Sequence, residues 1–97
     1  MGLASSAVWG RKRRGGTSKR HVVMYSRRRC GLCDEARATI LAEHGRSGSP
    51  FVFEEVFIDG DDELERAHGL RVPVIEIDGV ERFETFVDPS RLRRLLR

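Results

Sequence analysis

Two apolar segments separated by a helix-like stretch constrain the fold of this chain more than any other feature. The segments 21–25 and Phe51–Ile58 are rich in β-branched and aromatic residues, which is typical of short strands. Between them, residues 31–44 predict a helix that Gly45 is placed to end. The predicted buried face of this helix carries Cys33, Ala36, Ile40 and Leu41. Both strands are predicted to be buried on two faces, which favours an α/β fold with a parallel pair joined by a right-handed crossover.

Further along the chain, the sequence predicts a shorter helix and a hairpin. The acidic stretch Asp59–Glu63 supplies the first turn of the helix, and Gly69 is placed to end it. The dipeptide Asp78-Gly79 favours a two-residue hairpin between strands over Val74–Ile77 and Val80 to about Phe86.

A C-terminal helix completes the predicted order of elements. Asp88 is a suitable N-cap and Pro89 a suitable first helical residue. The apolar residues of this helix are Leu92, Leu95 and Leu96. A chain of 97 residues allows one small domain, which we place at residues 21–97, and its modest core means that any substrate is bound at the surface.

Residues 1–20 differ from the rest of the chain in charge. They hold six of the 18 basic residues and none of the 15 acidic ones, so a net charge of +6 precedes a domain of net charge −3. Gly and Ser are interspersed without periodicity, and we expect a disordered, mobile tail. Contact of this tail with nucleic acid is the less favoured alternative, because solvated basic tails are common. No apolar run approaches the roughly 20 residues of a membrane span, and no membrane partner is expected.

The only two cysteines, Cys30 and Cys33, form a C-x-x-C motif where the first strand gives way to the first helix. Cys30 falls at the helix N-terminus, where free backbone N–H groups, the helix dipole and the basic run Arg27–Arg29 stabilise an anion. A free cysteine has a pKa of about 8.5, and such surroundings lower it to roughly 3.5–7.5. Asp34 and Glu35 moderate this effect by repelling the thiolate. Cys30 is therefore predicted to be the reactive thiolate, and Cys33, one turn inward, the less exposed resolving thiol.

The spacing of the cysteines also bears on cellular compartment and metal binding. A disulfide between them closes almost no loop, so it would remove little entropy from the unfolded chain and would be a poor structural staple. We therefore expect a reducing, cytoplasmic environment and a redox or metal role. One C-x-x-C supplies two ligands, whereas zinc and iron–sulfur sites take four, and the three histidines lack the spacing to complete a site. We expect the protein to be a monomer, and we expect no metal site in a monomer.

The predicted order β-α-β-α-β-β-α, with C-x-x-C at the first helix and Val72-Pro73 before the third strand, resembles the thioredoxin superfamily. Within it, the chain is similar to small glutaredoxin-like proteins over residues 21–96. The segments that carry this resemblance are Tyr25–Cys33 and Arg71–Val74. The resemblance implies a thioredoxin-like fold with a four-stranded mixed sheet and helices on both faces.

The resemblance also implies roles for individual residues. In such proteins the first cysteine attacks and the second resolves, which carries over to Cys30 and Cys33. The proline before the third strand is usually cis and lies against the thiols, which carries over to Pro73; a trans proline entering an edge strand is the alternative. The backbone of Val72 would then pair with an extended substrate segment. The other candidate substrate-binding residues are Tyr25, Arg27 and Leu32.

Glutathione-binding glutaredoxins resemble one another in two features, of which this chain has one. Arg27 matches a basic residue three positions before the first cysteine. A Gly-Gly followed by Asp after the fourth strand has no match, because the segment Phe83–Asp88 places a bulky ring and a negative charge there. We therefore expect a protein disulfide or another low-molecular-weight thiol as substrate. No bound cofactor is expected, and glutathione stays a candidate co-substrate.

Together these features predict a small glutaredoxin-like enzyme, a thiol–disulfide oxidoreductase that reduces protein or low-molecular-weight disulfides by a dithiol mechanism. Two alternatives stay open. The first is binding of a metal or an iron–sulfur cluster through C-x-x-C in a dimer. The second is a redox-inert binding module in which the thioredoxin fold presents a surface and the tail recruits nucleic acid.

Overall fold

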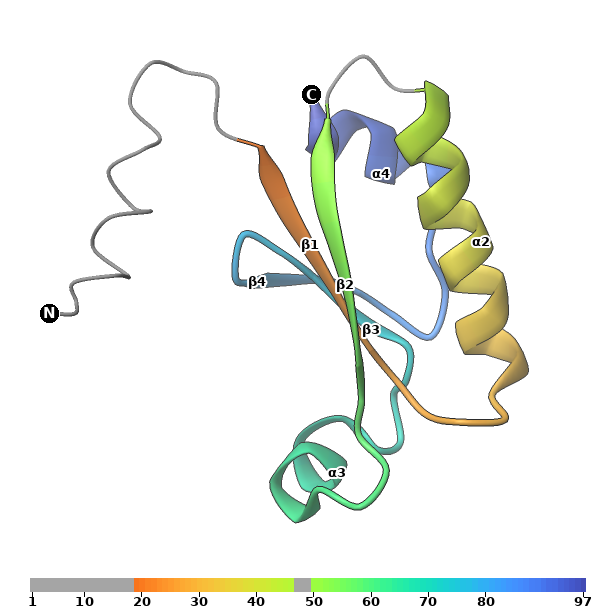
Figure 1. Cartoon of the computed structure of the whole chain (residues 1–97), viewed down its shortest axis with the longest axis vertical. Helices are drawn as coiled ribbons and strands as arrows, with labels where there is room; N and C mark the ends of the chain where they lie inside the picture. The colour runs from red at the N-terminus through yellow and green to blue at the C-terminus, as the bar shows by residue number, and fades with distance from the viewer. Residues whose placement is uncertain (1–18, 47–49) are drawn as a thin grey trace, which may run out of the picture.

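A computed structural model of the chain describes residues 19–46 and 50–97, which form one four-stranded sheet and three helices (Figure 1). The expected tail lies outside the described residues except for its last two. The elements follow one another as β1 (Arg20–Ser26), α2 (Gly31–Arg46), β2 (Phe51–Phe57), α3 (Asp62–His68), β3 (Val74–Ile77), β4 (Val80–Glu84) and α4 (Pro89–Leu96). This order confirms the prediction. Among the described residues, no helix combines the length and apolar character needed to cross a membrane.

The strands lie in the order β2-β1-β3-β4, with β1 in the interior of the sheet. β1 and β2 are parallel, with Arg20 opposite Phe51 and Ser26 opposite Phe57. β3 is antiparallel to β1, and β4 is antiparallel to β3. The sheet is therefore mixed, and α2 makes the predicted crossover between the parallel strands. The carboxyl end of β1 leads directly into the loop that carries Cys30.

The main core lies on one face of the sheet, beneath α2 and α4. Val22 and Met24 point to this face from β1, and both are fully buried. They pack in one cluster with Ile40 of α2 and with Leu92 and Leu96 of α4. The burial of these two leucines confirms the expected apolar face of the C-terminal helix. The same helix begins as predicted, since the Asp88 carboxylate accepts a hydrogen bond from the backbone N–H of Ser90.

The buried face of α2 differs from the prediction at one position. Leu41 is 47% exposed, so its predicted burial is wrong, whereas the other three positions are buried. Leu41 lies about 100° around the helix from Ile40, and the residue that continues the buried face is Glu43. The Glu43 carboxylate accepts hydrogen bonds from the Arg93 guanidinium at 2.7–3.2 Å. The buried face of α2 therefore continues through an ion pair with α4 rather than through Leu41.

The second face of the sheet is covered only at one end. Tyr25 points away from the main core, because it lies between the buried residues Met24 and Ser26 of β1, and its ring stacks on His68 of α3 at 4.3 Å between centroids. α3 contributes no buried residue. Helices therefore lie on both faces, as predicted, but α3 sits at the foot of the sheet (Figure 1).

The prediction that both parallel strands are buried on two faces is wrong. β2 is an edge strand, and its side chains alternate between the core face and the uncovered face. Val52 on the uncovered face is 39% exposed. An apolar run indicates a strand, but it does not distinguish an interior strand from an edge strand whose second face is open.

The hairpin forms as predicted, but β4 ends earlier than predicted. Asp78 and Gly79 both have positive φ, at 53° and 83°, as a two-residue hairpin of this type requires. β4 ends at Glu84 rather than Phe86 because Thr85 has φ 69°. The Thr85 N–H donates to the carbonyl oxygen of Pro73 at 2.7 Å, which turns the chain out of the strand.

Two helix boundaries also differ from the prediction. α2 continues past Gly45 to Arg46. The second helix begins at Asp62, three residues later than Asp59, because the Asp61 carboxylate caps it by accepting a hydrogen bond from the backbone N–H of Leu64.

Candidate functional site

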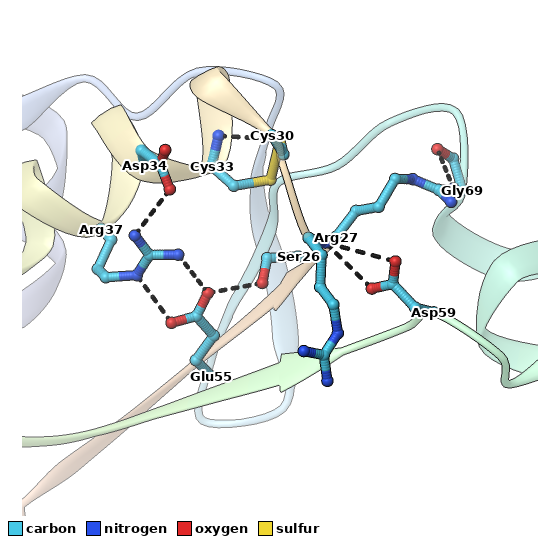
Figure 2. Close-up of a disulfide and its surroundings, with 10 residues drawn as sticks. Ser26, Arg27, Cys30, Cys33, Asp34, Arg37, Glu55, Asp59 and Gly69 are labelled. Atoms are coloured by element: carbon cyan, nitrogen blue, oxygen red, sulfur yellow. Dashed lines mark hydrogen bonds and ion pairs between the residues drawn. A yellow bond between two sulfur atoms is a disulfide. The ribbon is translucent and has the colours of Figure 1, made fainter.

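Cys30 and Cys33 form a disulfide at the start of α2, with their Cα atoms 5.2 Å apart (Figure 2). Cys30 precedes the helix and is half-buried, whereas Cys33 lies in the first turn and is fully buried, as predicted. The backbone N–H of Cys33 donates to the Cys30 Sγ at 3.1 Å. The more accessible sulfur is therefore also the one that receives an N–H group from the helix start. Such a contact favours negative charge on this sulfur when the disulfide is reduced.

Hydrogen bonds hold the loop before Cys30 against the segment that follows β2. The backbone N–H of Arg28 donates to the Asp59 carboxylate at 3.1 Å, and the N–H of Ile58 donates to the carbonyl oxygen of Ser26 at 2.9 Å. Arg29 has φ 57°, which lets the chain turn sharply between β1 and α2. These contacts fix where the helix begins, and therefore where Cys30 lies.

Four polar side chains fasten α2 to the sheet beneath the disulfide (Figure 2), and we call Ser26, Asp34, Arg37 and Glu55 the α2 clamp. The Ser26 hydroxyl donates to the Glu55 carboxylate at 2.6 Å. The Arg37 guanidinium donates to both oxygens of the same carboxylate at 2.8 and 2.6 Å. Its Nη1 donates to Asp34 at 2.9 Å. Because Arg37 lies one turn after Cys33, the clamp holds in place the helical turn that carries the buried sulfur.

The clamp was not predicted, although the sequence carries a signal for it. Glu55 interrupts the apolar run of β2 and stands opposite Met24 in the parallel register, so it shares the core face. A carboxylate on this face requires a partner. Hydrogen bonding from Arg37 lowers the pKa of Glu55 against the opposing effect of burial. Hydrogen bonds to Glu55 and Asp34 raise the pKa of Arg37 in turn.

The lowered pKa of Glu55 predicts a loss of stability in acid. A carboxyl group whose pKa is lower in the folded chain stabilises the fold above its ordinary pKa of 4.5 and ceases to do so as the pH falls through the lower value. We expect the difference in unfolding free energy between the wild type and Glu55→Gln to be constant above about pH 5.5 and to shrink below about pH 4.5. Denaturant unfolding from pH 7 to pH 3 measures this difference.

The control for this experiment is Glu63→Gln, which removes an exposed carboxylate of α3. Its unfolding free energy should stay within about 0.5 kcal/mol of the wild-type value at neutral pH. If the difference between wild type and Glu55→Gln grew as the pH fell, the assignment of Glu55 as an ionised, stabilising group would be wrong.

Arg27, a candidate for both thiolate stabilisation and substrate binding, points toward α3. Its Nη2 donates to the Gly69 carbonyl oxygen at 3.1 Å, and its Nη1 lies 3.8 Å from the Glu65 carboxylate. Figure 2 shows the Arg27 side chain extending away from the disulfide. The Arg28 guanidinium lies over the Phe57 ring, 5.0 Å from its centroid. The structure therefore does not bring these two guanidinium groups together with the sulfurs, and their predicted role stays a prediction.

Tyr25, a candidate substrate-binding residue, lies outside the main core. Its ring is half-buried between the sheet and His68. Burial raises the pKa of Tyr25, and the negative charges of Glu76 and Glu54 raise it further. Its hydroxyl is therefore a neutral hydrogen-bonding group at physiological pH, and its predicted contact with substrate stays a prediction.

Val72, Pro73 and Leu32 lie near the disulfide end of the sheet. The Val72-Pro73 peptide bond is cis, as the resemblance implied. Because Tyr25 pairs with Val74, the antiparallel register places Pro73 opposite Ser26, at the end of β1 that leads to Cys30. Leu32 is 47% exposed between the two cysteines.

A shallow hollow of about 50 Å³ separates the first turns of α2 from the segment after β4. Leu32, Ala36 and Val87 supply its apolar lining, and Phe86 stands at its side with 64% of its surface exposed. This ring and Leu32 therefore line the same hollow, whose walls also include the polar residues Glu35, Thr39 and Thr85.

A comparison with protein families shows that the glutaredoxin-like domain (DUF836) matches residues 21–97. The chain belongs to the glutaredoxin-like family. Among solved structures, this glutaredoxin-like chain is 30% identical to protein Ne2328 from Nitrosomonas europaea, with a TM-score of 0.70 over 82% of this chain and 94% of that one. It is 41% identical to protein XcR50 from X. campestris, with a TM-score of 0.62 over 77% of this chain and 93% of that one.

More distant structures agree on the fold. A thioredoxin from Halobacterium salinarum is 19% identical, with a TM-score of 0.58 over 81% of this chain and 73% of that one, and it shows the shared thioredoxin fold. Among curated proteins no match was found. The glutaredoxin-like family and the thioredoxin fold support a redox function in general. Across residues 19–46 and 50–97, no group of three or more His, Cys, Asp and Glu side chains is arranged to hold a metal ion.

Proposed function

We propose that this glutaredoxin-like protein is a thiol–disulfide oxidoreductase that reduces disulfides by a dithiol mechanism. The observation that carries the proposal is the asymmetry of the pair: Cys30 is accessible and accepts an N–H from the helix start, while Cys33 is fully buried beside it. A thiolate is the attacking species in disulfide exchange, so the accessible, stabilised sulfur is the suitable nucleophile.

The proposed reaction begins with the reduced pair. The Cys30 thiolate attacks one sulfur of the substrate disulfide, which forms a mixed disulfide and releases the other substrate sulfur as a thiolate. Cys33 then loses its proton and attacks the Cys30 Sγ, which closes the Cys30–Cys33 disulfide and releases the second substrate thiolate. The substrate gains two electrons and, after protonation, two hydrogens, while the enzyme dithiol is oxidised. An external thiol reductant restores the dithiol by the reverse exchange.

The surroundings of the disulfide support an extended polypeptide as the substrate. Val72 and Pro73 directly precede β3, beyond the point where its partner β1 ends, so a substrate segment can add to the sheet there. Leu32 and Phe86 expose apolar surface on the adjacent hollow. Glutathione-binding glutaredoxins resemble one another in two glycines after the fourth strand. At that place in this chain, the tripeptide glutathione would meet Thr85 and Phe86 instead. We therefore propose a protein disulfide as the favoured substrate and glutathione as a secondary one.

A Cys33→Ser variant should trap the substrate. Without the resolving thiol, the mixed disulfide on Cys30 persists, because the second attack has no nucleophile. We expect a reduced Cys33→Ser protein, mixed with an oxidised protein disulfide, to form a covalent adduct that dithiothreitol releases. Non-reducing gel electrophoresis and mass spectrometry measure the adduct and locate its sulfur.

The matched control is the double variant Cys30→Ser/Cys33→Ser, which should form no adduct. The same experiment with oxidised glutathione compares the two substrate classes. An adduct on the double variant, or no adduct on Cys33→Ser with any disulfide, would contradict the proposed mechanism.

A further inference from the structure

The sheet face opposite α2 and α4 carries two carboxylates in register with the interior strand. We call this surface, made by Val23, Val52, Glu54, Val56 and Glu76, the open face. Val23 of β1 pairs with Glu54 of β2 on one side and with Glu76 of β3 on the other. These three side chains therefore form one row across the sheet, with an apolar residue between two acids. α3 lies at the foot of the sheet (Figure 1), so among the described helices none covers this row.

The two acids of this row differ from the other acids nearby. Glu81 and Glu84 on β4 are both paired with the Arg71 guanidinium. Among the described residues, neither Glu54 nor Glu76 has an ion pair or a side-chain hydrogen bond. Both nevertheless act on Tyr25 at the end of the same face, since their charges raise its pKa. The open face is therefore a negative surface with valines between and beside its acids.

Residues 7–14 of the same chain have the complementary chemistry. They join the apolar stretch Ala7–Trp9 to the basic cluster Arg11–Arg14, and five residues lie between Arg14 and the start of β1 at Arg20. The six Cα–Cα steps from Arg14 to Arg20 span up to about 20 Å when the chain is extended. Val23 lies three residues along β1, roughly 10 Å from Arg20. Gly15-Gly16 permits a sharp reversal between the cluster and the strand, so the cluster can reach the acidic row.

We propose that residues 7–14 bind to the open face of the same molecule, with Arg11–Arg14 opposite Glu54 and Glu76 and with Trp9 against the valines. The basic cluster supplies the charges that these two carboxylates lack among the described residues. Trp9 supplies an apolar ring for Val23, Val52 and Val56. The short connection to β1 raises the effective concentration of the segment at the face, so weak contacts suffice.

Charge also distinguishes this occupant from nucleic acid. Residues 21–97 have a net charge of −3, which repels a polyanion and attracts a basic segment. A second copy of the chain carries the same segment, but it lacks the advantage of covalent connection. The segment of the same molecule is therefore the favoured partner of the open face.

The single tryptophan of the chain provides a direct test. Trp9 fluorescence in the full-length wild type should lie at a shorter wavelength, and be less quenched by acrylamide, than in the full-length variant Glu54→Gln/Glu76→Gln. Removal of two ion-pair partners, one exposed and one half-buried, should lower the ratio of bound to free segment on the order of tenfold. Replacement of Arg11, Lys12, Arg13 and Arg14 by Gln should have the same effect without touching the sheet. Concentrated salt should shift the wild type toward both variants.

The matched control is Asp62→Asn/Glu63→Gln, which removes the same charge from exposed positions on α3 and should leave the Trp9 signal at the wild-type value. Far-UV circular dichroism checks that each variant is folded. Three outcomes would overturn the proposal: Trp9 signals that are equal in the wild type and both test variants, a signal that depends on protein concentration, or a shift that occurs only when duplex DNA is added. The second outcome would assign the face to another copy, and the third would assign the segment to nucleic acid. All of these readouts are independent of thiol exchange.

Discussion

Replacement of Cys30 by serine will abolish thiol–disulfide exchange. A serine hydroxyl stays protonated at neutral pH, so the variant loses the anion that attacks the substrate. The remaining thiol, Cys33, is fully buried and cannot reach an incoming disulfide while the fold is intact. We expect the rate to fall more than about 1,000-fold, as removal of a nucleophile usually causes. The measurement is the release of the aromatic thiolate from a chromogenic disulfide by the reduced protein.

The Cys33→Ser variant is the matched control, because it removes one thiol of the same pair. It should release one equivalent of aromatic thiolate in a rapid first step, since Cys30 still attacks, but it should not form the internal disulfide. If Cys30→Ser released thiolate at the wild-type rate, Cys33 would be the nucleophile and the assigned roles would be reversed.

Replacement of Glu55 by alanine will cause the largest loss of stability at the α2 clamp. The variant leaves the Arg37 guanidinium and the buried Ser26 hydroxyl without their shared carboxylate. Loss of one partner of a buried ion pair costs about 3–5 kcal/mol, and because Arg37 is 30% exposed we expect about 2–3 kcal/mol. For a domain of this size, this loss lowers the melting temperature by roughly 8–24 °C. Calorimetry of the oxidised protein measures the shift.

Glu63→Ala provides a control at an exposed carboxylate. Glu63 lies on α3 and has no ion pair among the described residues, so its replacement should change the unfolding free energy by less than about 0.5 kcal/mol. Equal melting temperatures for Glu55→Ala and Glu63→Ala would show that the clamp does not stabilise the fold.

Local signals in the sequence were sufficient to predict the order of the elements. The strand at 21–25, the C-x-x-C motif and the helix after it follow from short-range patterns of apolar residues and helix starts. Asp78-Gly79 and Asp88-Pro89 specify a turn and a helix start through their own backbone preferences. These features depend on neighbours in the chain, and the structure has them where they were predicted.

Features that depend on distant parts of the chain could not be predicted in the same way. Glu43 continues the buried face of α2 although it is charged, because Arg93, fifty residues away, supplies an ion-pair partner. The exposure of β2 follows from its place at the edge of the sheet, which its own composition does not reveal. The Glu55–Arg37 pair likewise depends on how α2 crosses the sheet. In each case the environment of the residue depends on a contact between elements that are distant in the sequence. The local sequence pattern predicted that environment incorrectly or did not predict it.

The burial of Cys33 within the first turn of α2 has a consequence for coordination chemistry. A metal ion or an alkylating reagent that approaches the folded domain meets one sulfur atom per chain, that of Cys30. A metal ion that binds both sulfurs of one chain must reach the buried Cys33 Sγ, and the α2 clamp, which holds the first turns of the helix to the sheet, opposes any opening of that turn. Weakening the clamp should make the domain a better chelator as well as a less stable fold.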